Sequence, residues 1–180
     1  FVTISLICAS RQQAETAFSL AWEGIRERIG IFDRHNPGSA LGLLNSQGKL
    51  DAAPAALLTV LEQAEQVGQL TKDAFNPAIA PVVDLYHPYR DGARLPDKQA
   101  VAEALALAAP GGLRRSGQNL HLTRAGMSLT LDGIAQGHIA DKAPALPSQF
   151  GVAHHLTTAG GDSRVHGLPD KGRRWAMVRE

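Results

Sequence analysis

An alternation of apolar and polar side chains opens the chain and predicts a β-strand over residues 1–8. Ser10 and Gln13 then have the spacing of a capping box, in which each side chain bonds the other residue's backbone N–H at a helix start. Apolar residues recur at helical spacing from residue 14 to residue 29. We therefore expect a helix of roughly five turns after the first strand.

Three further helical patterns follow in the first two thirds of the chain. Ser39 suits the N-cap of a short helix that Gly48 ends. Pro54 suits the first turn of the next helix, whose apolar stripe runs to residue 67. A third helix is expected from about residue 97 to residue 108. Between the last two helices, the prolines at positions 77 and 81 should prevent a long regular element.

Strand pairs dominate the remaining sequence. Leucines alternate with polar residues before and after a turn at residues 124–126, which indicates a hairpin over residues 120–131. Residues 156–158 and 164–166 flank a Gly-Gly-Asp turn as a second hairpin, and residues 174–180 resemble a further strand. Helices that precede hairpins favour an α+β fold, with a mixed or antiparallel sheet and flanking helices.

Composition narrows the class of protein. The 180 residues are 44% hydrophobic and 19% charged, enough for one sizeable globular core. The net charge is +1 and no basic block is present, so nucleic acid is not an expected partner. The single Cys8 cannot form an internal disulfide. The chain starts and stops inside strand-like segments without a leading methionine, so we expect it to be incomplete at both ends.

The segment over residues 129–141 carries the most suggestive chemistry. Gly133 and Gly137 permit close approach of the backbone to a ligand, and the helix start offers unpaired N–H groups to a phosphate. The spacing matches neither a P-loop nor a dinucleotide fingerprint, so a tight strand-to-helix connection remains an alternative. The later Gly-Gly-Asp sequence could close the other side of a pocket, or be a simple hairpin turn.

The seven histidines provide little support for a metal site. His154 and His155 are neighbours on a predicted strand, so they point to opposite faces. His138 and Asp141 could share one face of a helix, and a surface pair is the simpler interpretation. No Gly-x-Ser-x-Gly sequence supports a hydrolase triad.

Four ordered segments, together with the first strand, resemble the ApbE family of FAD:protein FMN transferases. They are residues 37–45, 71–77, 131–141 and 159–162. In the family these segments contain Asp-Ser…Leu-Asn, Thr-x-Gly-Ala-Phe-Asp-Pro, Leu-Gly-Gly-Ile-Ala-Lys-Gly-Tyr-Ala-x-Asp and Ala-Gly-Gly-Asp. The Gly-Ile-Ala-Gln-Gly sequence of residues 133–137 is closer to the NosX branch, flavinylation factors associated with nitrous-oxide respiration.

The chain departs from the family pattern at five positions. Asn76 and Thr130 stand where aspartate is usual, and Asp132 stands where glycine is usual. Gln136 replaces a lysine and His138 replaces a tyrosine. A glutamine amide forms hydrogen bonds but brings no positive charge to a pyrophosphate.

The resemblance implies one ApbE-like domain over residues 1–180, without the family's C-terminal part, which carries carboxylate and threonine ligands of magnesium. It implies a transferase that binds FAD and Mg²⁺, moves FMN to a threonine of a partner protein, and releases AMP. The partner would be a respiratory flavoprotein. The enzyme would be exported, either periplasmic or anchored as a lipoprotein.

Site residues follow from the same resemblance. The backbone carbonyl of Gly133 matches a magnesium ligand, whereas no catalytic residue can be assigned. The flavin-binding positions are His35, Ala74, Phe75, Asn76, Thr130, Gln136, Gly160, Gly161 and Asp162. Ser39, Thr71 and Asp141 are expected to shape loops around the pocket by local hydrogen bonds, a role that Asp162 could also have.

Two alternatives remain open. One is an FAD-binding accessory or carrier protein without transfer activity, which the loss of lysine at position 136 favours. The other is an FAD pyrophosphatase that releases FMN and AMP to water.

Overall fold

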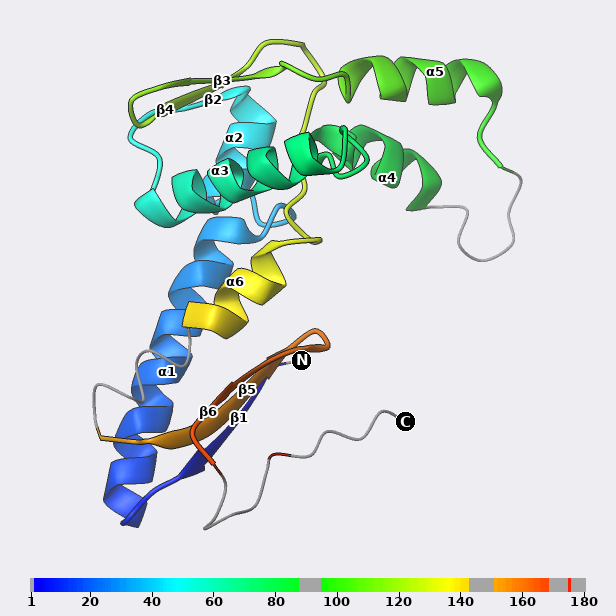
Figure 1. The fold of residues 1–180 in the computed structure, drawn as a ribbon. Helices are drawn as coiled ribbons and strands as arrows, with labels where there is room; N and C mark the ends of the chain where they lie inside the picture. Colours follow the sequence, from blue (N-terminus) through cyan, green and yellow to red (C-terminus); the bar gives the residue numbers. More distant parts are fainter. Residues whose placement is uncertain (1, 88–94, 143–150, 169–174, 176–180) are drawn as a thin grey trace. The chain divides into compact units, whose positions relative to one another are not determined.

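The computed structural model describes residues 2–87, 95–142, 151–168 and 175. The chain divides into two compact units, residues 1–28 with 134–180, and residues 29–133, and each is described by itself. The elements (Figure 1) are β1 (Val2–Ile7), α1 (Arg11–Phe32), α2 (Ala40–Gln47), β2 (Lys49–Leu50), α3 (Ala55–Leu70), the 3-10 helix η1 (Pro77–Ile79), α4 (Ala80–Tyr86), α5 (Lys98–Leu107), β3 (Leu113–Ser116), β4 (Asn119–Leu122), α6 (Ala135–Lys142), β5 (His154–Ala159) and β6 (Asp162–His166).

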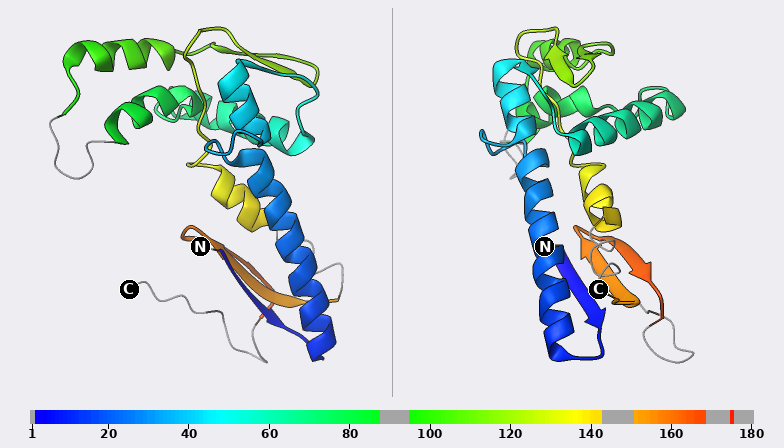
Figure 2. Two further views of the ribbon diagram at one scale, coloured as in Figure 1. Left: turned by 180° about the vertical axis from the view of Figure 1, so that it is seen from behind. Right: turned by 90° about the vertical axis from the view of Figure 1, so that its left-hand side faces the viewer.

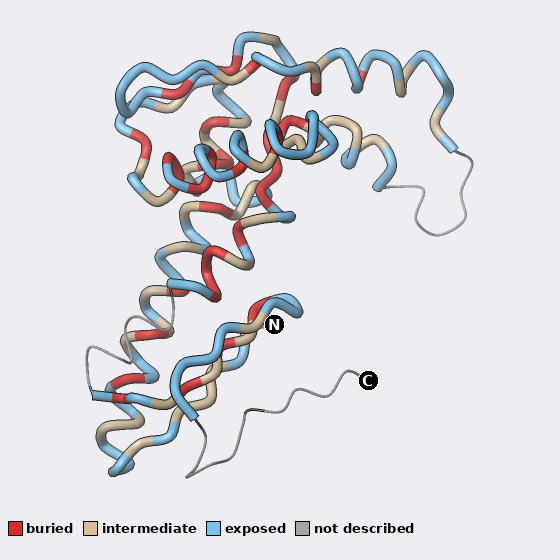
Figure 3. Tube along the Cα trace, in the orientation of Figure 1, coloured by how far each residue is buried: buried red, intermediate tan, exposed pale blue. Residues whose placement is uncertain are grey.

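The first unit contains an antiparallel sheet in the order β1-β5-β6 (Figures 1 and 2). Val2 pairs with Ala159 at one end of the β1–β5 ladder, and Ile7 pairs with His154 at the other. Burial alternates along β5, where His155, Thr157 and Ala159 are buried (Figure 3). The predicted first strand and second hairpin are therefore confirmed.

The start of α1 confirms the Ser10 half of the capping box, whereas a bond to the Gln13 side chain comes from the residue before Ser10, Ala9. The backbone N–H of Gln13 donates to Ser10 Oγ at 3.2 Å, and the N–H of Ala9 donates to Gln13 Oε1 at 3.0 Å. These bonds satisfy groups that a helix start leaves without partners. The helix has 22 residues, so it is somewhat longer than expected.

The helix start expected within residues 129–141 lies at Ala135. The N–H of His138 donates to the Ile134 carbonyl at 3.2 Å, so Gly137 lies inside the first helical turn. Its absent side chain faces Asp162, whose Oδ2 would lie 3.6 Å from a Cβ. The turn before the helix is therefore confined to the residues around Gly133.

The second unit holds the sheet β2-β4-β3 and a core in which Leu41, Leu44, Leu57 and Val60 are fully buried. The predicted hairpin over residues 120–131 is wrong, because β4 pairs with the preceding β3 instead. The turn between them contains Gly117, with a φ of 60°. Strand β3 has the sequence Leu-Arg-Arg-Ser, which lacks an apolar alternation and was therefore not expected.

All residues from 127 to 131 except residue 128 are buried, yet this segment forms no strand. A side chain takes the place of a strand partner there. The N–H of Leu129 donates to Asn45 Oδ1 at 2.8 Å, and Asn45 Nδ2 donates to the Leu129 carbonyl at 2.9 Å. The amide of Asn45 thus satisfies both backbone groups of Leu129, and the alternation of leucines reflects burial alone.

The prolines at positions 77 and 81 are followed only by short helices of three and seven residues, so the expected absence of a long regular element is confirmed here. Each lies at the start of an element, η1 or α4, where a proline N–H is not needed. Helices α4 and α5 lie side by side (Figures 1 and 2). Of the strand expected over residues 174–180, only Trp175 lies within the described residues, and it is not in a strand. No helix among the described residues is long and apolar enough to cross a membrane.

Candidate functional site: a pocket around Phe75

One pocket of the second unit brings together five of the ten residues that the resemblance singles out. It has a volume of about 580 Å³, within the range of small-molecule sites. The segment after α3, the helices η1, α4 and α5, and the segment before Gly133 all contribute to its wall. We call it the Phe75 pocket, and the five residues in it are Ala74, Phe75, Asn76, Thr130 and Gly133.

Local hydrogen bonds set the path of the chain into this pocket. Thr71 Oγ1 donates to the Val67 carbonyl at 2.8 Å and accepts from the N–H of Phe75 at 3.0 Å. Between them, Lys72 and Asp73 have left-handed φ values of 53° and 64°. This tight reversal ends α3 and presents Ala74 and Phe75, and it gives Thr71 the loop-shaping role expected of it.

Both ends of the Asn76 side chain are used inside the protein. Its Oδ1 accepts from the N–H of Ala78 at 2.9 Å and thereby caps η1. Its Nδ2 donates to the Ala108 carbonyl at 2.7 Å, at the end of α5. Asn76 therefore holds two walls of the pocket together. An asparagine side chain supplies both a donor and an acceptor, whereas an ionised aspartate supplies acceptors alone.

Thr130 ties the segment before Gly133 to η1. Its N–H donates to the Pro77 carbonyl at 2.8 Å, and its Oγ1 accepts from the N–H of Asp132 at 3.2 Å. The residue is 9% exposed. The hydroxyl shapes the turn that leads to Gly133 and still retains its own proton to donate.

Gly133 lies against the ring of Phe75. A Cβ built on Gly133 would lie 3.2 Å from Phe75 Cε2, closer than ordinary van der Waals contact. Gly133 itself is exposed, and its φ is not in the left-handed region. The glycine therefore serves close approach to an aromatic ring and not an unusual backbone conformation.

Arg34 is a residue of this site that sequence reasoning missed. Its side chain is 7% exposed and contacts Asp84 and Asp132, and Asp132 lines the Phe75 pocket. The pKa of Arg34 is raised, first by its hydrogen bond to Asp84, although burial acts in the opposite direction. The sequence signals this role only through the position of Arg34, two residues after Phe32, which is buried in the structure.

His35, the neighbour of Arg34, has a different environment. It is exposed, and its N–H donates to Asp33 Oδ1 at 3.0 Å in the loop before Ser39. Ser39 is fully buried, accepts from the N–H of Gly42 at 2.9 Å and donates to the Asp33 carbonyl at 2.6 Å. His35 does not line the Phe75 pocket, whereas Ser39 has the expected loop-fixing role.

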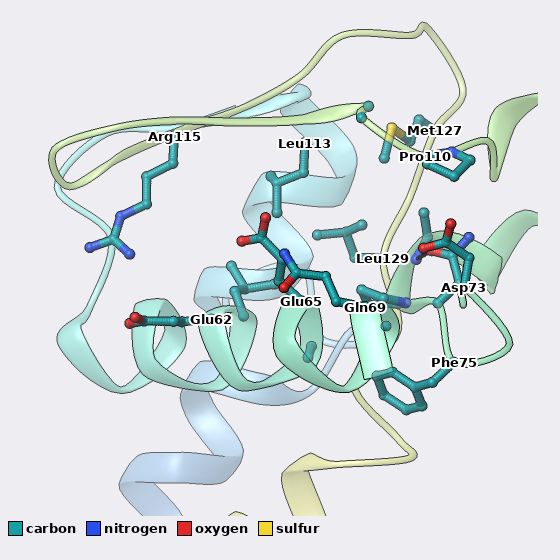
Figure 4. A pocket seen from close by; sticks show the side chains of 18 of the residues that line it. Glu62, Glu65, Gln69, Asp73, Phe75, Pro110, Leu113, Arg115, Met127 and Leu129 are labelled. Atoms are coloured by element: carbon teal, nitrogen blue, oxygen red, sulfur yellow. Dashed lines mark hydrogen bonds between the residues drawn. The ribbon is translucent and has the colours of Figure 1, made fainter. Parts of the chain in front are cut away.

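A second pocket of this unit, the α3 pocket, has a volume of about 400 Å³. Glu62, Glu65 and Asp73 lie at its rim, with Arg115 across from them on β3 (Figure 4). Leucines of α3 and of residues 113–129 line its interior. It includes Phe75 and Asn76 but not Ala74, Thr130 or Gly133, so the Phe75 pocket is the better candidate for the flavin-binding chemistry.

In the first unit, α6 and the β5–β6 turn bring the remaining predicted residues together. The side-chain amide of Gln136 lies directly over Gly160, where an added Cβ would overlap it. Gly160 and Gly161 have φ values of 58° and 103°, which glycine adopts without strain. Asp162 begins β6 and faces Gly137 of α6. The two glycine segments of the sequence therefore meet, as expected.

His138 and Asp141 do not form the surface pair that their spacing suggests, because only Asp141 is exposed. His138 is buried, which is the first cause of its lowered pKa, and the cations Lys142 and Arg28 add to the effect. Asp141 forms an exposed ion pair with Arg164 at 3.6 Å. Within the part of the chain that the structure describes, no group of three or more His, Cys, Asp and Glu residues could hold a metal ion.

Comparisons with known proteins agree with this architecture. The sequence model of the ApbE family matches residues 2–178. The FAD:protein FMN transferase of Treponema pallidum is 31% identical over 155 residues, which are 80% of this chain and 42% of that protein.

Solved structures show the same fold. A variant of the flavin transferase ApbE from Vibrio cholerae matches with a TM-score of 0.88 and 21% identity, over 99% of this chain and 63% of its own. The apo flavinyl transferase ApbE of Pseudomonas stutzeri matches with a TM-score of 0.86 and 18% identity, over 99% and 58%. The expected α+β, ApbE-like fold is confirmed, and the chain spans less than two thirds of these relatives. Because the family model covers nearly the whole sequence, the chain belongs to the ApbE family.

Proposed function

We propose that this chain forms flavin-binding parts of an FAD:protein FMN transferase. The observation that carries the proposal is the Phe75 pocket, which gathers five residues from two segments far apart in the sequence. The name of the Treponema pallidum relative supports the same activity.

In the proposed reaction, the hydroxyl oxygen of an acceptor threonine forms a bond to the phosphorus of the FMN half of FAD. The bond from that phosphorus to the bridging oxygen breaks, and AMP leaves with the bridging oxygen. The hydroxyl proton is released. We take the acceptor to be a respiratory flavoprotein. Bound Mg²⁺ would neutralise charge that develops on the two phosphates.

The Phe75 pocket suits a ring system of FAD. The half-buried ring of Phe75 offers an aromatic face, and Ile79, Val83 and Leu105 add an apolar wall. Thr130 and Asp132 add polar groups at one side. Apolar lining with a few placed polar groups is typical of cofactor sites. We propose that the pocket holds one ring system while the pyrophosphate lies at the exposed Gly133.

The chain also offers oxygen ligands for magnesium. The exposed backbone of Gly133 adjoins the Asp132 carboxylate, and Mg²⁺ prefers oxygen ligands. In nucleotide sites Mg²⁺ is usually held by one or two protein groups, substrate phosphates and water. The pair therefore fits part of a coordination shell, and we propose the Gly133 carbonyl as one ligand.

Gln136 supports a second candidate, an FAD-binding carrier without transfer activity. Its amide is neutral and lies over Gly160. A neutral amide stabilises pyrophosphate charge less than the lysine usual in the family. The carrier and the transferase therefore differ in whether Gln136 suffices for the chemistry.

Incubation of the full-length protein with FAD, Mg²⁺ and a threonine-bearing acceptor tests the activity. Mass spectrometry should detect an FMN increment on the acceptor, with AMP in equal amount, and Gln136→Lys should accelerate the transfer. If the wild type and Gln136→Lys both bind FAD but yield neither modified acceptor nor AMP, the protein is the carrier. AMP release without acceptor modification would identify a pyrophosphatase.

We also propose that the protein is exported, in the periplasm or as a lipoprotein, and belongs to the NosX branch. The similarity of residues 133–137 to that branch is the support. Fractionation of cells that express the full gene tests the location, and recovery with cytosolic markers would contradict it.

A further inference from the structure

The guanidinium of Arg34 faces two carboxylates of the same unit, those of Asp84 and Asp132. Its guanidinium contacts Asp84 through two bonds, Nη2–Oδ1 at 2.8 Å and Nη1–Oδ2 at 3.1 Å. This bidentate pair fixes the orientation of a guanidinium whose side chain is 7% exposed. The buried Nε makes no hydrogen bond to any described residue and lies 3.5 Å from Asp132 Oδ2, so the guanidinium charge also faces this second carboxylate.

Asp132 places a negative charge at the edge of the Phe75 pocket. Its side chain is 69% exposed, it lines the pocket, and it directly precedes Gly133. The bond from its N–H to Thr130 Oγ1 fixes its backbone. An uncompensated carboxylate here would repel the phosphates of a flavin nucleotide.

We propose that Arg34 is a positioning residue that offsets part of the negative charge of Asp132, and that it thereby lessens the repulsion of phosphate-bearing flavins while leaving riboflavin binding unaffected. The proposal rests on the function proposed above. Arginine stays protonated at every physiological pH, so the compensation does not depend on pH. Riboflavin carries no phosphate, so its binding should respond little to the pair.

Titration of the full-length protein with FAD and with riboflavin, in EDTA, separates charge from structure. Arg34→Gln should weaken FAD binding about three- to tenfold, because the partly solvated carboxylate of Asp132 then repels the FAD phosphates moderately. Riboflavin binding should weaken less than about twofold. The double variant Arg34→Gln with Asp132→Asn should restore FAD binding. Higher salt should reduce the difference between wild type and Arg34→Gln.

A matched control is Arg11→Gln, which removes an exposed ion pair with Glu15 in the other unit and should change neither affinity. Equal weakening of FAD and riboflavin by Arg34→Gln, or no rescue by Asp132→Asn, would overturn the inference. If Arg34→Gln fails to fold, Asp132→Asn alone decides. It should tighten FAD about two- to threefold and leave riboflavin unchanged, and an unchanged ratio would overturn the inference. A wild-type protein that binds neither flavin would instead overturn the proposed function.

Discussion

Replacing Asn76 by aspartate tests how the Phe75 pocket is held together. Asn76→Asp keeps the acceptor for the N–H of Ala78 but removes the donor that lies 2.7 Å from the carbonyl of the buried Ala108. A carboxylate oxygen then faces a carbonyl oxygen.

The magnitude follows from two contributions. The lost hydrogen bond is worth about 1 kcal/mol, and the buried carbonyl without a partner costs about 1–3 kcal/mol. We expect the free energy of unfolding to fall on the order of 2–4 kcal/mol, and Tm to fall by roughly 4–16 °C for a protein of this size class. The affinity for FAD should also fall, because Asn76 links the segment that carries Phe75 to the end of α5.

Thermal unfolding followed by circular dichroism measures the effect, with Asn119→Asp as a matched control. Asn119 Oδ1 accepts from the N–H of Ala52 at 3.1 Å at an exposed site, and aspartate retains that acceptor. The control should change the stability by less than about 0.5 kcal/mol. At this size, each kcal/mol corresponds to roughly 2–4 °C in Tm. If the Tm values of the two variants therefore lie within about 2 °C of each other, the reasoning about the Ala108 carbonyl is refuted.

Two further perturbations address the pocket and the sheet. Gly133→Val should displace the Phe75 ring, because a Cβ would lie 3.2 Å from Phe75 Cε2. Flavin fluorescence should show FAD binding weakened about tenfold, with little change in Tm. Parallel losses of FAD affinity and Tm would instead indicate a merely structural turn. The buried His155 has a pKa lowered first by burial, so the fold favours its neutral form and the unfolded chain binds the proton more readily. Stability should therefore be highest above the ordinary histidine pKa of about 6.5 and fall as the pH drops below it; urea unfolding should show a weaker pH dependence for His155→Leu, and an unchanged dependence would contradict this.

Local chemistry explains the parts of the fold that the sequence predicts well. Ser10, Ser39 and Gly48 mark helix ends through bonds to backbone groups a few residues away. The Gly-Gly turn between β5 and β6 is likewise local, since both glycines have positive φ. Such features act within one helical turn or hairpin, so spacing alone reveals them.

The errors arose where distant residues decide the structure. Leu129 is held by Asn45, 84 positions away, so an alternation of leucines was mistaken for a strand. Arg34 acquires its significance only through Asp84 and Asp132, and no spacing rule connects them. The residues of the Phe75 pocket came from resemblance to the ApbE family, because isolated Ala, Phe and Asn residues carry no recognisable chemistry before they are folded together.

A crystal structure of the full-length protein with FAD tests the central claim most directly. We expect one ring system of FAD against the face of Phe75, between Ala74 and Gly133, with a phosphate near the Gly133 backbone. Phe75→Ala, crystallised under the same conditions, should show reduced occupancy of FAD. Density for FAD without contact to Phe75, Ala74 and Gly133 would contradict the account.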